Sequence, residues 1–100
     1  MKKIYIWGSG YICDRILSLS EKSVPELYRN NDFFIAGIID NDQSKWGETF
    51  HGRIIVSPKE AIDMGFDLII VLLTNIIDVM NQAQYGYGVS QNKIKDKTLL

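Results

Sequence analysis

Gly8 and Gly10, with Ser9 between them, form a turn whose chemistry suits a bound phosphate. The turn follows a short apolar segment, residues 4–7, and precedes a segment with helical spacing. Glycines let the backbone turn tightly and approach a ligand, and the first N–H groups of a helix attract anions. This stretch therefore predicts a phosphate- or nucleotide-binding turn, beside which Tyr11 could stack on a base. The alternative is a tight strand-to-helix turn without a ligand.

Asp40 is the second candidate binding residue, because it directly follows the apolar segment 33–39. A carboxylate at the end of such a strand can accept hydrogen bonds from a ribose diol. An acid there favours a free ribose over a 2′-phosphate, hence NAD over NADP, although UDP and S-adenosylmethionine carry the same diol. The competing interpretation is an ordinary turn residue at a strand end.

Three apolar runs, residues 4–7, 33–39 and 67–73, predict strands that are covered on both faces, as in a parallel sheet. Residues 54–56 predict a shorter strand, and residues 92–100 a weaker fifth one. Since these strands alternate with helices, the chain predicts an α/β, three-layer Rossmann-like fold with a mostly parallel sheet of four or five strands in the order 3-2-1-4(-5).

Capping residues mark the expected helices. Ser57, followed by proline, begins one helix, and Gly65 ends it. Asn75 is the expected N-cap of another, which the glycines at 86 and 88 should end. Residues 12–20 have helical spacing, and residues 23–28 predict a second short helical piece before a turn at 30–32. Residues 43–52 are expected to form an irregular excursion.

In a parallel sheet of this order, ligands bind at the carboxyl ends of the strands beside the point where the strand order reverses. Three segments should meet at that edge: the glycine turn, the residues after the second strand, and those after residue 73. The predicted nucleotide-binding residues are Gly8, Ser9, Gly10, Tyr11, Asp40, Asn41, Thr74 and Asn75.

Composition excludes several other functions. The net charge of −1 argues against a nucleic-acid partner, which normally needs a basic face. Cys13 is the one cysteine and His51 the one histidine, so neither an internal disulfide nor a cysteine or histidine metal cluster is expected. No catalytic residue is predicted, because no serine or cysteine has a convincing base partner, and Cys13 fits a core position. With a single cysteine, a reducing cytoplasm is the expected compartment. The apolar runs fall short of the ~20 residues of a membrane span.

Several segments together resemble a known family. The segments are residues 4–10, residues 36–42 with 45–47, residues 52–60 and residues 66–71. They resemble a Rossmann-like domain of bacterial surface-polysaccharide and sugar-nucleotide enzymes, over nearly the whole chain. Similar modules precede sugar acetyltransferases, glycosyltransferases, dehydratases and methyltransferases, and a related core occurs in NADH-sensing redox repressors.

The resemblance implies that the domain binds NAD(P) or a UDP-sugar through Gly8, Ser9, Gly10 and Asp40, and the composition leads us to expect no metal. Cys13 stands where the family pattern has its last glycine, so the chain departs there from the pattern of domains that bind a full dinucleotide. We expect residues 1–100 to be one nucleotide-binding domain, either a fragment or the N-terminal module of a longer enzyme. The alternative is a structural or dimerisation module, without a ligand of its own, of an S-adenosylmethionine-dependent methyltransferase or a glycosyltransferase. A homo-oligomer or an attached catalytic domain is the expected partner.

Overall fold

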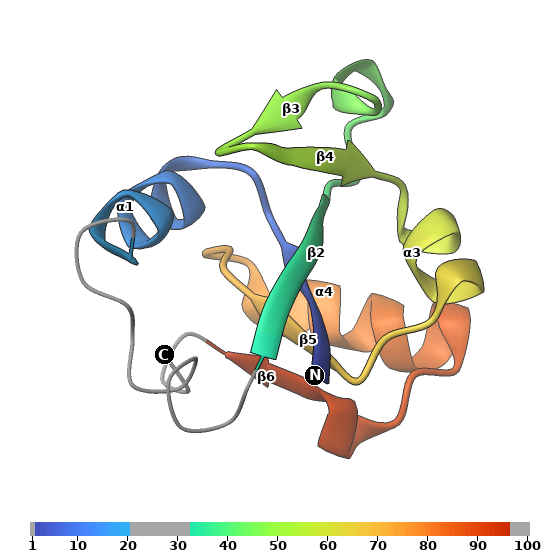
Figure 1. Ribbon diagram of the computed structural model, residues 1–100. Helices are drawn as coiled ribbons and strands as arrows, with labels where there is room; N and C mark the ends of the chain where they lie inside the picture. Colours follow the sequence, from blue (N-terminus) through green and yellow to red (C-terminus); the bar gives the residue numbers. More distant parts are fainter. Residues whose placement is uncertain (1, 21–32, 97–100) are drawn as a thin grey trace.

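One six-stranded sheet runs through the protein, with the strand order β3-β4-β2-β1-β5-β6 (Figure 1). The computed structural model describes residues 2–20 and 33–96. The strands are β1 (Lys2–Trp7), β2 (Phe33–Ile39), β3 (Thr49–Phe50), β4 (Arg53–Val56), β5 (Leu68–Val71) and β6 (Ile94–Asp96). All neighbouring strands are parallel except β3 and β4.

The predicted α/β fold is confirmed, and the strand order differs in one detail. The five predicted strands lie as β4-β2-β1-β5-β6, which is the expected order 3-2-1-4-5. The additional strand β3 forms an edge hairpin with β4, inside the segment that was expected to be irregular. His51 and Gly52 close this hairpin with φ angles of 51° and 76°. Positive φ at both central residues is the geometry of tight hairpin turns, but histidine is not one of their usual residues.

Helices cover both faces of the sheet (Figure 1). Helix α1 (Tyr11–Ser20) packs on one face, and α3 (Pro58–Met64) and α4 (Ile76–Asn81) pack on the other. Helix α4 continues as a π-helical segment, η2 (Gln82–Gly86), so the expected single helix is divided. Short 3₁₀ segments are η1 (Gln43–Lys45) and η3 (Gln91–Lys93). The helical piece expected at 23–28 and the turn at 30–32 lie outside the described residues.

The core has two halves, one on each side of β1. Tyr5 and Trp7 point toward α3 and α4, whereas Ile4 and Ile6 point toward α1, and all four are fully buried. This alternation follows from the period of two in a strand, and it explains why a centrally placed strand is apolar at every position. Cys13, on α1, is fully buried in the half of the core between α1 and the sheet, and burial raises the pKa of its thiol to about 12. The expectation of a core cysteine is therefore confirmed.

Helix α3 begins and ends where its capping residues predict. The Ser57 side chain accepts a hydrogen bond of 3.0 Å from the backbone N–H of Glu60, and Gly65 ends the helix with a φ of 83°. Asn75 occupies the N-cap position of α4, but its side chain makes no capping hydrogen bond, which corrects the expectation. Within the described ranges, no helix is long and apolar enough to cross a membrane.

We expect Ser57→Ala to lower the free energy of unfolding by about 0.5–2 kcal/mol, because the N–H of Glu60 loses its acceptor. Urea unfolding monitored by circular dichroism measures the change. Lys59→Ala is the matched control, since Lys59 is exposed on the same helix and its ion pair with Asp63 is screened by solvent. Equal midpoints for Ser57→Ala and the unsubstituted protein would contradict the capping role.

Candidate functional site

The carboxyl ends of three neighbouring strands meet at one edge of the sheet. Trp7, at the end of β1, is paired in register with Ile39 of β2 and with Val71 of β5. The backbone N–H of Gly8 donates to the carbonyl of Ile39 over 2.7 Å, and Leu72 donates to Trp7 over 3.0 Å. The glycine turn, the residues after β2 and the residues after β5 are therefore held side by side, as the strand order predicts.

The two glycines of the turn have different roles. Gly8 has a φ of 121°, and a Cβ atom added there would lie 2.7 Å from the Leu73 side chain. Gly8 is thus required by the backbone and by packing. Gly10 is exposed, and an added Cβ would meet nothing within 4 Å. Its carbonyl accepts from the backbone N–H of Asp14, so Gly10 begins α1 and faces open space.

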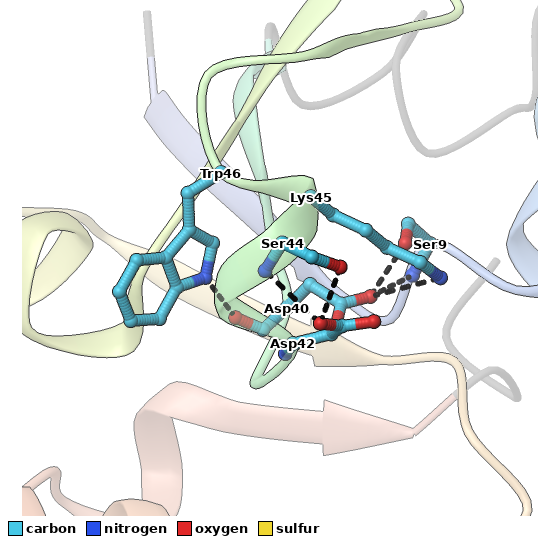
Figure 2. A network of polar contacts seen from close by, with 6 residues as sticks. All are labelled: Ser9, Asp40, Asp42, Ser44, Lys45 and Trp46. Atoms are coloured by element: carbon cyan, nitrogen blue, oxygen red, sulfur yellow. Dashed lines mark hydrogen bonds and ion pairs between the residues drawn. The ribbon is translucent and has the colours of Figure 1, made fainter.

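Asp40 is engaged by groups of the protein itself (Figure 2). The backbone N–H and the hydroxyl of Ser9 both donate to Oδ2 of Asp40, and the N–H of Asp42 donates to Oδ1 over 2.8 Å. The Lys45 ammonium lies 4.0 Å from Oδ2, and the Asp40 side chain is 15% exposed. A carboxylate has about four acceptor positions, and groups of the protein occupy three of those of Asp40.

The loop after β2 is ordered around Asp40 (Figure 2). The indole N–H of Trp46 donates to the Asp40 carbonyl over 2.7 Å. The Asp42 carboxylate accepts from the hydroxyl and the N–H of Ser44, and these hydrogen bonds lower the pKa of Asp42 below its ordinary value. The segment 43–52, which the sequence predicted as irregular, therefore begins with a 3₁₀ turn in a defined position and continues into the hairpin of β3 and β4.

The other predicted binding residues occupy separate places along this edge. Tyr11 is 73% exposed, and its hydroxyl accepts from the Arg15 guanidinium over 3.2 Å. The carboxamide of Asn41 forms two reciprocal 3.0 Å hydrogen bonds with that of Gln82, a contact that the sequence did not indicate. Thr74 borders a cavity of about 300 Å³ after β5. That cavity is lined by Ile12, Val71, Leu72, Leu73, Thr74, Ile76 and Asp96.

His51 supports the structure of the edge hairpin. Its Nε2 lies 2.8 Å from Oδ1 of Asp14, so it joins the hairpin to the first turn of α1, and its ring packs edge-on against Phe50. Among residues 2–20 and 33–96, no group of three histidine, cysteine, aspartate or glutamate side chains could hold a metal ion.

The mostly parallel sheet, the helices on both faces and the glycine turn after the first strand define a Rossmann-like α/β domain. The family model described as C2185-like, N-terminal, matches residues 1–95, and the chain belongs to that family. No curated protein matches the chain.

Solved structures share the fold at low sequence identity. UDP-D-quinovosamine 4-dehydrogenase from Vibrio fischeri has a TM-score of 0.60 at 14% identity, over 95% of this chain and 75% of that chain. RSP, a Rex-family repressor, has a TM-score of 0.65 at 13% identity, over 99% and 54%. RSP in complex with β-NAD⁺ and operator DNA has a TM-score of 0.61 at 11% identity, over 97% and 50%. The chain thus spans about half the length of the repressor.

Proposed function

We propose that this chain is a nucleotide-binding domain that takes NAD(P) or a UDP-sugar at the carboxyl edge of the sheet. The observation that carries the proposal is the open space at Gly10, at the start of α1 and beside the Asp40 carboxylate. A phosphate placed there would face the first N–H groups of a ten-residue helix. The fold shared with a protein solved with β-NAD⁺ supports the same ligand class.

The domain serves, in this proposal, as an accessory module associated with surface-polysaccharide or sugar-nucleotide biosynthesis. Its role is to bind a nucleotide, since Asp40 is the one carboxylate among the predicted binding residues and is bonded to Ser9 and Asp42. Any chemistry would then belong to a catalytic domain attached to the chain or to a partner protein.

A second candidate function is a structural or dimerisation module without a ligand, in a methyltransferase or a glycosyltransferase. The contact between Ser9 and Asp40 favours it, because the carboxylate expected to hold a ribose is already hydrogen-bonded within the protein. Exposed aromatic side chains on the surface, among them Tyr85 and Tyr87, are available for self-association.

Ligand-observed NMR separates the two candidates. NAD, NADP, UDP, a UDP-sugar and S-adenosylmethionine are each mixed with the purified protein, and saturation transfer to the ligand is recorded. We expect transfer to NAD(P) or to the UDP-sugar. Silence from all five ligands, with sedimentation showing a concentration-dependent dimer, would favour the structural module instead.

We expect Ser9→Ala to strengthen the binding of NAD or a UDP-sugar about fivefold, which corresponds to about 1 kcal/mol. The substitution removes the hydroxyl that occupies Oδ2 of Asp40, so a ribose diol would no longer have to displace it. Isothermal titration of both proteins measures the difference. Ser44→Ala is the control, since the Ser44 hydroxyl bonds to Asp42 and not to Asp40. Weaker binding by Ser9→Ala would contradict a ribose-binding role for Asp40.

A further inference from the structure

A groove of about 510 Å³ lies next to Asp40, between the loop after β2 and the π-helical segment η2. Its volume is within the range of small-molecule sites, about 300–1,000 Å³. It is lined by Asn41, Trp46, Ser57, Pro58, Lys59, Gln82 and Tyr87. Only Asn41 of this set was a predicted binding residue, so sequence reasoning missed the groove almost entirely.

Two features of the lining suit a planar heterocycle. Trp46 and Tyr87 are 38% and 37% exposed, so both rings present part of their surface to the groove and to solvent. Trp46 is also held in place, because its indole N–H donates to the carbonyl of Asp40. An aromatic side chain fixed by a hydrogen bond is a preorganised stacking surface for a nucleobase.

The second feature is the carboxamide pair of Asn41 and Gln82. Each carboxamide donates one N–H to the other and accepts one, over 3.0 Å in both directions. A base edge that carries a donor beside an acceptor, as in adenine or uracil, presents the same pattern. Exchanging the partner carboxamide for such a base edge conserves the number of hydrogen bonds. The Gln82 carboxamide can therefore turn to a base, because the displaced Asn41 carboxamide is exposed and can bond to water instead.

We propose that this groove holds the base of the bound nucleotide, with Trp46 as the stacking surface and the Gln82 carboxamide bonded to the base edge. The proposal rests on the proposed nucleotide-binding function and adds the position of the base and the residues that contact it. Asn41 directly follows Asp40, so a ribose near that carboxylate would place the base beside the groove.

Nucleosides test the groove apart from the glycine turn, because they carry a base and no phosphate. Adenosine and uridine are titrated while tryptophan fluorescence is excited at the red edge of its band. Trp7 is fully buried, so quenching by a stacked base reports on Trp46. We expect one nucleoside to quench the emission, and we expect Trp46→Phe to abolish the quenching.

Gln82→Met then tests the carboxamide. We expect about tenfold weaker binding of that nucleoside, because one bidentate contact is lost. Gln84→Met is the matched control: Gln84 lies in the same π-helical segment but does not line the groove, so its substitution should leave binding unchanged. A second readout needs no variant. N6,N6-dimethyladenosine or 3-methyluridine lacks the donor of the base edge and should bind the unsubstituted protein about as weakly as the parent nucleoside binds Gln82→Met.

The outcomes separate this inference from the proposed function. Nucleotides that bind equally well to the unsubstituted protein and to Gln82→Met would overturn the base site and leave nucleotide binding intact. Nucleosides that bind in a Gln82-dependent way, with no gain from added phosphates, would support the groove and overturn the role of the glycine turn. No binding of nucleosides or nucleotides would overturn both.

Discussion

Replacing Gly10 with leucine should weaken nucleotide binding at least tenfold, a loss of about 1.4 kcal/mol or more, and leave the protein folded. An added Cβ at Gly10 meets nothing within 4 Å, and the φ angle of this glycine is not in the left-handed region. The leucine side chain would therefore extend into the open space where we place the phosphate. Its cost to the fold is limited to a poorer helix start, about 1 kcal/mol.

Titration calorimetry and thermal unfolding of the same samples measure the two effects separately. Gly10→Ala should give an intermediate loss of affinity, since a methyl group fills less of that space. Tyr85→Leu is the control for an added exposed leucine, because Tyr85 is 85% exposed on η2 and does not line the groove. Unchanged affinity in Gly10→Leu would remove the glycine turn from the proposed site.

Replacing Gly8 with alanine should instead destabilise the fold, and lower the free energy of unfolding by about 2–6 kcal/mol. A φ of 121° is strained for any residue with a side chain, at about 1–3 kcal/mol. The new Cβ would also lie 2.7 Å from the Leu73 side chain and 3.0 Å from the Leu72 carbonyl, which adds about 1–3 kcal/mol of overpacking.

Urea unfolding measures this loss, and Gly10→Ala is the matched control, because it is the same substitution two residues away in open space. In a Leu73→Ala background, Gly8→Ala should cost less, because the clash with the Leu73 side chain is gone, while the backbone strain and the close contact with the Leu72 carbonyl remain. An unfolding midpoint for Gly8→Ala equal to that of the unsubstituted protein would contradict both arguments.

Much of the fold could be read from local patterns. The continuous apolar runs predicted β1, β2 and β5, and the cap and stop residues predicted α3, because these signals depend on neighbouring residues alone. The hairpin of β3 and β4 was missed, since its turn uses His51 at a positive φ in place of a usual turn residue. The π-helical segment was missed as well, because the spacing of apolar residues over one such short segment is nearly the same as in an α-helix.

The sequence by itself determined the segments and order of five strands of the sheet, all but the edge strand β3, and that the glycine turn and Asp40 reach one edge. Only the tertiary structure decided the partners of those residues. Ser9 bonds to Asp40 across 31 positions, and Asn41 bonds to Gln82 across 41. Hydrophobic periodicity indicates which face of an element is buried, but nothing in the local sequence indicates the distant partner of a polar side chain at a strand end. That choice is made by the register of the strands, which brings the two loops together.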